Sequence, residues 1–155
     1  IRHIHSVGRA GWEKYSTIAK ERGFDKYTNI KISEYIYDMQ LHLAAADIVI
    51  GRAGAMTLSE IASMGKAAII IPSPNVTNNH QYKNAKVLAD GDAAVLIEEK
   101  DLTGARLIEK VRALAEKPAY RAVTEHNIRK FAVVGTLDRI YEIICELVDE
   151  SQSGR

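Results

Sequence analysis

An anion-binding turn is indicated by the segment GRAGAMT at residues 51–57. A short apolar run at 47–50 precedes it and an amphipathic stretch follows, the order of a strand, a glycine-containing turn and a helix. The first amides of such a helix lack backbone partners and lie at the positive end of its dipole, so they can bind a phosphate or a diphosphate. No Lys-Ser/Thr pair follows the glycines, so the segment is not a P-loop. An ordinary strand-to-helix turn is the alternative.

Glu60 lies one turn into this helix, where its carboxylate can accept hydrogen bonds from both hydroxyls of a ribose. The spacing Thr57-x-x-Glu60 also fits a capping box, in which the Glu side chain bonds back to the Thr57 amide. The two interpretations predict different rotamers of Glu60.

A third polar segment, NNHQYKN at residues 78–84, follows two prolines. The carboxamide of Gln81 is suited to neighbouring sugar hydroxyls, and Asn84 lies one turn further on nearly the same helix face. The alternative is a helix start capped by asparagine, with solvated polar residues.

Residues 34–39 (EYIYDM) end another apolar run. Backbone groups there can pair with the edge of a base, and Tyr35 or Met39 can pack on its ring. Alternatively, Asp38 caps a short helix and Met39 fills the core.

We expect no metal and no cofactor. His3 and His5 share one strand face but have no third ligand at metal-site spacing. The triplet Asp90-Gly91-Asp92 lies between a helix and a strand and indicates a C-cap turn around Gly91. Cys145 lies on an apolar helix face, which favours an inert thiol.

Apolar runs and amphipathic stretches alternate along the chain, which predicts an α/β fold with a Rossmann-like parallel sheet and helices on both faces. Ligands of such sheets bind beyond the carboxyl ends of the strands, so the loops at 8–10, 36–38, 51–56 and 72–79 should face a cleft. The strands are expected at 1–7, 29–36, 47–50, 67–71 and 93–97, and the helices at 11–22, 38–46, 57–64, 80–89, 103–117, from 118 onward and at 136–148.

One domain over residues 1–150 with a flexible tail at 151–155 is expected from the length of 155 residues. The 21 basic and 20 acidic residues give a net charge of +1, without a basic run, which disfavours nucleic acid as a partner. Apolar residues make up 46% of the chain, which excludes intrinsic disorder. The unbroken apolar runs are far too short to cross a membrane.

Several motifs together resemble the MurG family, the bacterial N-acetylglucosaminyltransferases of peptidoglycan synthesis, which are family 28 glycosyltransferases of GT-B fold. The resemblance covers about residues 1–135 and implies the C-terminal, donor-binding half of such an enzyme without its first strand. The matching residues are Tyr35-Ile36-x-Asp38-Met39, Ala46-Asp47-x-x-Ile50-x-Arg52-x-Gly54-Ala55-x-Thr57-x-x-Glu60, Pro72 and His80-Gln81-x-x-Asn84-Ala85.

The resemblance implies a role for each candidate residue in binding UDP-N-acetylglucosamine. Ile36 would bind uracil through its backbone, with Met39 nearby. Met56 and Thr57 would hold the diphosphate, with Arg52, Gly54 and Ala55 shaping that loop. Glu60 would bind the ribose, and Gln81 the sugar with support from Asn84. His80 stands where the family often has a first glutamine.

The resemblance also implies partners and a location. The partners are an N-terminal acceptor domain and, through it, lipid I, which receives the sugar to give lipid II at the cytoplasmic face of the cell membrane. No catalytic residue is assigned within this chain, which alone should be inactive. The alternatives are a separate subunit completed by a membrane partner, a non-catalytic nucleotide-binding module and a UDP-sugar epimerase.

Overall fold

The structure is a computed structural model that describes residues 1–153, with side chains through residue 149. The chain forms two compact units, Ile1–His42 and the part from Leu43 onward. The strands form two separate parallel sheets, one in each unit, with the orders β1-β2 and β3-β4-β5.

The first unit is a βαβ unit with a two-stranded sheet. Its elements are β1 (His3–Ser6), α1 (Arg9–Glu21), the 3-10 turn η1 (Phe24–Lys26) and β2 (Ile30–Ser33), followed by the start of α2 (Met39–Ala45). The strands pair in parallel with His3 opposite Ile30 and Ser6 opposite Ser33. Both strands are shorter than the expected 1–7 and 29–36.

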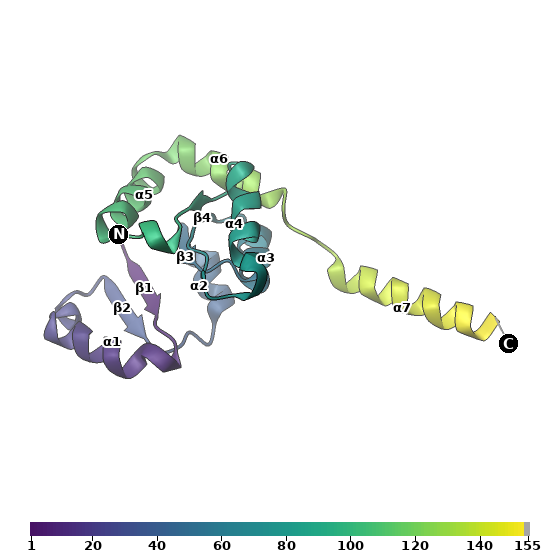
Figure 1. The fold of residues 1–155 in the computed structure, drawn as a ribbon, viewed down its shortest axis with the longest axis horizontal. Coiled ribbons are helices and arrows are strands. Elements are labelled where there is room, and N and C mark those ends of the chain that lie inside the picture. Colours follow the sequence, from purple (N-terminus) through teal and green to yellow (C-terminus); the bar gives the residue numbers. More distant parts are fainter. Residues whose placement is uncertain (154–155) are drawn as a thin grey trace. The chain divides into compact units, whose positions relative to one another are not determined.

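The second unit contains the three-stranded sheet and the remaining helices (Figure 1). Its elements are β3 (Ile48–Gly51), α3 (Ala55–Met64), β4 (Ala67–Ile70), η2 (Thr77–Asn79), α4 (His80–Asp90), β5 (Val95–Leu96), η3 (Glu99–Asp101), α5 (Gly104–Glu116), α6 (Pro118–Arg129) and α7 (Thr136–Ser153). All three strands are parallel, with Gly51 opposite Ile70 and Ile70 opposite Leu96.

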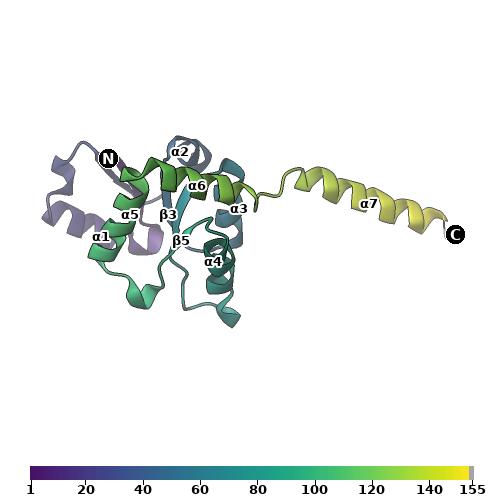
Figure 2. The same cartoon turned by 90° about the horizontal axis from the view of Figure 1, so that it is seen from above.

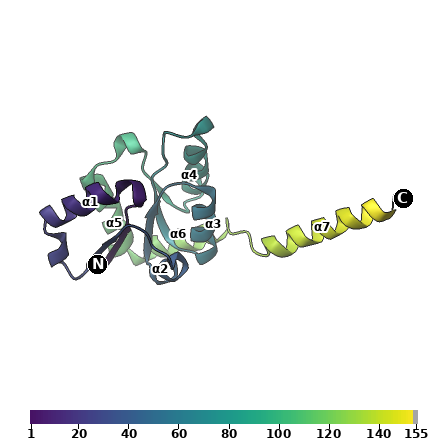
Figure 3. The same ribbon diagram turned by 90° about the horizontal axis from the view of Figure 1, so that it is seen from below.

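The central strand β4 is buried on both faces. Its residues alternate between two cores, because successive side chains of a strand point to opposite faces. Ala68 and Ile70 pack in a cluster with residues of α3 and α4 and with Ile128 of α6. Ala67 and Ile69 pack on the opposite side with Leu114 of α5. Helices therefore cover both faces of this sheet, as the sequence predicts, and α5 lies across the strands from α3 and α4 (Figures 2 and 3).

Local signals place several helix ends. Thr103 caps α5 by accepting a hydrogen bond from the Arg106 amide at 3.1 Å. Pro118 begins α6, where its missing N–H leaves no helix hydrogen bond unmade. The predicted C-cap turn around Gly91 is confirmed: Gly91 is the C-cap residue of α4, with a φ of −91°. The left-handed residue is Asp92, with a φ of 51°.

The last helix, α7, presents apolar side chains along one face at i, i+3, i+4 spacing. They include Leu137, Tyr141, Ile144 and Leu147, and each is at least half exposed. Residues 151–153, expected in the tail, continue this helix, and residues 154 and 155 lie outside the described residues. Among the described residues, no helix combines the length and apolar character that a membrane span needs.

Two glycine substitutions test how the backbone limits the fold. Gly65 ends α3 with a φ of +60°, and a Cβ there would overlap the Arg129 guanidinium. Gly104 is the first residue of α5, and a Cβ there would meet no atom within 4 Å. We expect Gly65→Ala to lower the free energy of unfolding by about 1–2 kcal/mol. Gly104→Ala should leave it unchanged or raise it by up to about 1 kcal/mol.

Urea denaturation of the two variants measures this difference directly. If Gly65→Ala is as stable as the wild type, the left-handed turn at the end of α3 is not a constraint on the fold.

Candidate functional site

Two loops leave the same edge of the three-stranded sheet. One follows β3 and leads into α3, and the other follows β4 and leads through η2 into α4. Because β3 and β4 are parallel neighbours, their carboxyl ends meet. A further hydrogen bond, from the Ile71 amide to the Gly51 carbonyl at 2.9 Å, extends the pairing to the start of both loops. The structure therefore brings residues 52–57 close to residues 71–81.

The first loop ends in a helix start with free amide donors. Gly54 is the N-cap residue, in extended conformation, and its carbonyl accepts the first helical hydrogen bond from the Leu58 amide at 3.0 Å. Among the described residues, nothing accepts from the amides of 55–57. The ten-residue helix therefore begins with adjacent, unpaired N–H groups at its positive end, the arrangement on which the predicted anion-binding turn depends.

The two glycines of this loop, Gly51 and Gly54, are not required by the conformation of the turn. Neither Gly51 nor Gly54 has a positive φ, so the turn itself does not require glycine. A Cβ at either position would lie 3.8 Å from the Thr57 side chain, which is ordinary contact. Without side chains at these positions, the backbone of the loop is more accessible to a ligand.

Arg52 and Asn84 anchor the loop. The Nη1 atom of Arg52 donates to the Ile71 carbonyl at 3.2 Å and also pairs with the Glu99 carboxylate. On the other side, the Asn84 Nδ2 donates to the carbonyl of the fully buried Ala53 at 3.4 Å. The sequence analysis missed Glu99; an acidic residue directly after an apolar strand, at the same sheet edge, is the signal that could have found it.

The capping box that Thr57 and Glu60 could form is absent. Helix α3 begins at Ala55, so Thr57 is its third residue and not its N-cap. Glu60 is partly buried, and no hydrogen bond or ion pair engages its carboxylate within the described part of the chain. Its oxygens are therefore available to a ligand. Met56, two residues into the helix, is 78% exposed.

The start of α4 is set by backbone conformation. Asn78 and Asn79 have φ values of 53° and 52°, and no side chain caps the helix, so the asparagine cap considered above does not form. His80 is exposed, and its Nδ1 lies 2.9 Å from the Thr77 carbonyl. The Gln81 Oε1 accepts from the Ser73 amide at 2.9 Å, which closes the loop and leaves the side-chain NH₂ as a donor.

Ile36 and Met39 belong to the first unit, so they are not grouped here with the residues of the second. Ile36 is partly buried and Met39 is 37% exposed at the start of α2. The rings of Tyr35 and Tyr37 contact each other edge to face at 5.0 Å. The Asp38 carbonyl accepts from the Leu41 amide at 3.0 Å, which begins the helix.

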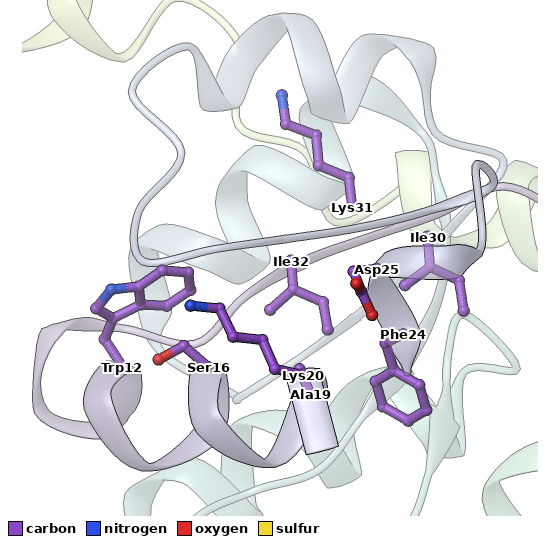
Figure 4. Close-up of a pocket in the computed structure, with 9 residues that line it drawn as sticks. All are labelled: Trp12, Ser16, Ala19, Lys20, Phe24, Asp25, Ile30, Lys31 and Ile32. Atoms are coloured by element: carbon purple, nitrogen blue, oxygen red, sulfur yellow. The ribbon is translucent and has the colours of Figure 1, made fainter. Parts of the chain in front are cut away.

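The first unit has an open cavity of about 410 Å³ between α1 and β2 (Figure 4). None of the candidate residues lines it. Figure 4 shows Trp12 and Ile32 on the same side of β2, with Lys31 pointing to the other side. A smaller cavity of about 260 Å³ lies between α3 and α4, and Ala55 and Asn84 are among its lining residues.

The two strand histidines stack on each other. The rings of His3 and His5 are 5.7 Å apart, and partial burial, followed by the charge of His3, lowers the pKa of His5. Within the described residues, no group of three or more His, Cys, Asp or Glu side chains could hold a metal ion.

Comparison with known proteins connects this geometry to one family. The curated relatives are named as UDP-N-acetylglucosamine–N-acetylmuramyl-(pentapeptide) pyrophosphoryl-undecaprenol N-acetylglucosamine transferases. The one from Thermoanaerobacter sp. (strain X514) is 41% identical over 138 residues, which cover 89% of this chain and 38% of the relative. The one from Acetivibrio thermocellus is 38% identical over 151 residues, covering 97% of this chain and 40% of the relative. The chain thus spans about two fifths of their length.

Solved structures agree with this relationship. The crystal structure of Acinetobacter baumannii MurG matches with a TM-score of 0.75 and 26% identity, covering 92% of this chain and 42% of that one. The glycosyltransferase VinC, at 20% identity and a TM-score of 0.61 over 83% of this chain and 36% of its own, shares the fold. The family model for the glycosyltransferase family 28 C-terminal domain matches residues 1–139. With its parallel sheets, flanking helices and helix-start amides, the chain belongs to the C-terminal domain family of the family 28 glycosyltransferases.

Proposed function

We propose that this chain is the donor-binding half of an inverting glycosyltransferase. The whole enzyme transfers N-acetylglucosamine from UDP-N-acetylglucosamine to the muramic sugar of undecaprenyl-linked lipid I and gives lipid II. The observation that carries the proposal is the set of unpaired amides at residues 55–57, at the carboxyl edge of the sheet of a family 28 domain. The names of the relatives supply the donor and the acceptor.

The amides of Met56 and Thr57 hold the diphosphate in this proposal. Small residues at 54 and 55 admit the phosphate oxygens to the backbone, and the helix dipole favours their negative charge. Arg52 shapes the loop through its bonds to Ile71 and Glu99. Glu60 accepts hydrogen bonds from the ribose hydroxyls, because its carboxylate has no other partner among the described residues.

The remaining contacts divide between the base and the sugar. Ile36 binds uracil through its backbone, with Met39 beside the ring. Gln81 offers its NH₂ group to a sugar hydroxyl, since its carbonyl oxygen already accepts from Ser73. When the Nδ1 of His80 donates to the Thr77 carbonyl, its Nε2 is left as an acceptor for a second hydroxyl. Asn84 supports these contacts from one turn further along α4.

The reaction is a single displacement at the anomeric carbon. The C4 hydroxyl of the muramic sugar attacks as its proton passes to a base, the bond between the anomeric carbon and the phosphate oxygen breaks, and UDP leaves. The helix-start amides stabilise the charge that develops on the leaving diphosphate. The base and the lipid I site belong to an N-terminal acceptor domain, so this chain alone transfers no sugar. The whole enzyme acts at the cytoplasmic face of the membrane as a peripheral protein.

A strand from outside this chain completes the donor half in this proposal. In the described residues, β1 pairs only with β2, and β3 pairs only with β4. Each therefore has one edge whose backbone groups lack a strand partner, and such edges are normally paired or covered.

Isothermal titration calorimetry tests the proposed donor. We expect heat with both UDP and UDP-N-acetylglucosamine. UMP should bind about tenfold or more weakly than UDP, because each hydrogen bond to a charged group contributes about 1.5–3 kcal/mol. Equal affinities for UMP and UDP would exclude the amides of 55–57 as a diphosphate site. If neither UDP nor UDP-N-acetylglucosamine gives heat, the proposed donor is excluded altogether.

A second prediction concerns Glu60 and the ribose. Glu60→Gln removes the charge but keeps the shape, so UDP affinity should fall about tenfold. Affinity for 2′-deoxy-UDP should fall less, because one of the hydroxyl contacts is already missing. Glu116→Gln, an exposed position at the end of α5, is the control and should change neither value. Equal losses for UDP and 2′-deoxy-UDP would argue against a contact with the 2′ hydroxyl.

The sugar contact of Gln81 can be separated from its loop contact. Gln81→Glu keeps an oxygen acceptor for the Ser73 amide and removes the NH₂ donor. We expect the affinity for UDP-N-acetylglucosamine relative to UDP to fall about three- to tenfold. Lys83→Gln, two residues away and exposed, should leave this ratio unchanged. An unchanged ratio in Gln81→Glu would favour a module that binds the nucleotide and ignores the sugar.

A further inference from the structure

Arg52 connects the carboxyl ends of three neighbouring strands. It lies directly after β3, and its Nη1 atom donates to the carbonyl of Ile71, directly after β4, at 3.2 Å. The same nitrogen pairs with the carboxylate of Glu99, which begins η3 beyond β5. One guanidinium therefore links the segments that follow three neighbouring strands.

The loop that Arg52 begins is fixed from its other side as well. Ala53 is fully buried, and its carbonyl accepts from Asn84 of α4 at 3.4 Å. The amides of 55–57 come next in the chain, so their direction depends on how firmly residues 52–54 are held. Amide donors that are already oriented before the ligand arrives can bind its negative charge without the free-energy cost of reorienting them.

We propose that Glu99 is a positioning residue for the diphosphate-binding amides. It acts through Arg52: its carboxylate keeps the guanidinium against the Ile71 carbonyl, and the guanidinium keeps the loop in place. The side chain of Arg52 is 53% exposed, so water can replace the Ile71 carbonyl as the partner of its guanidinium. The Glu99 carboxylate forms a charge-assisted hydrogen bond with the guanidinium, and such a bond is about twice as strong as a neutral one.

This role of Glu99 rests on the proposed function. The pairing of Glu99 with Arg52 could also have the opposite effect on UDP binding. If Glu99 instead competed with the diphosphate for Arg52, its removal would free a cation and strengthen UDP binding. The positioning role requires weaker UDP binding when Glu99 is removed, so the two roles differ in sign.

The neighbouring residue provides a matched control. Glu98 is also acidic, and its side chain is 37% exposed against 39% for Glu99, but it pairs with Lys100 at 3.0 Å and not with Arg52. The variants are therefore Glu99→Ala, Glu99→Gln and Glu98→Ala in the full-length protein, titrated with UDP and with uridine.

We expect Glu99→Ala to raise the Kd for UDP about two- to fivefold, the range that a partly exposed ion pair supports. The Kd for uridine, which has no phosphate, should not change. Glu99→Gln keeps an oxygen acceptor and should recover part of the loss, and Glu98→Ala should alter neither Kd. The Leu58 amide donates to the Gly54 carbonyl at the end of the loop. In the ligand-free protein its hydrogen exchange should be fastest in Glu99→Ala, intermediate in Glu99→Gln and unchanged in Glu98→Ala.

Three binding results would overturn the proposal: tighter UDP binding by Glu99→Ala, an unchanged Kd for UDP, or equal losses for UDP and uridine. Unchanged exchange at Leu58 would overturn it without any ligand. If the wild-type protein binds no UDP, the proposed function fails, whereas the exchange measurement still decides whether Glu99 holds the loop.

Discussion

The burial of β4 between two parallel neighbours is the constraint on which the candidate site depends. All four of its residues are buried, so it cannot shift relative to β3 and β5 without exposing one of its two cores. Because the three strands run in the same direction, their carboxyl ends stay together at one edge. Residues 52–57, 71–81 and 98–99 follow these ends and meet there, although they are far apart in the chain. The apolar strands therefore bring these loops together, and the hydrogen bonds of Arg52 and Asn84 then hold the first loop in place.

The electrostatics of this edge rely on the backbone more than on side-chain charge. Arg52 is the cation beside the loop, and the Glu99 carboxylate largely neutralises it. In the proposed complex, the attraction for a diphosphate therefore comes from the amides of 55–57 and from the dipole of α3. Such dipoles keep their direction when the ligand is absent, whereas a flexible lysine would have to be ordered on binding. The loop needs rigid anchors for this reason, and Arg52 and Asn84 provide them from opposite sides.

Patterns that act over short distances in the chain were sufficient to predict the scaffold. The apolar runs at 67–71 and 93–97 contain the parallel strands β4 (Ala67–Ile70) and β5 (Val95–Leu96), although β5 is shorter than predicted, and the glycine loop follows β3 at the expected edge. The capping box at Thr57 was not formed because the helix begins two residues earlier, which no local pattern distinguishes. The pairing of Arg52 with Glu99 spans 47 positions, so it follows from strand order and not from spacing. The hydrogen bond from the Ser73 amide to the Gln81 side-chain oxygen likewise depends on the path of the loop at 71–79, which local sequence patterns do not predict. The ligand contacts of all the candidate residues, with the base, the diphosphate, the ribose and the sugar, remain predictions.

The separation of apolar strands from polar loops has a consequence for how such domains diverge. Substitutions at positions such as His80 alter an exposed side chain and leave both cores untouched. In the proposed function His80 contacts the donor sugar, so selection could change which activated sugar is bound without first finding compensating mutations for stability. The fold is kept in the glycosyltransferase VinC at 20% identity, as expected when the exposed loops can change independently of the two cores.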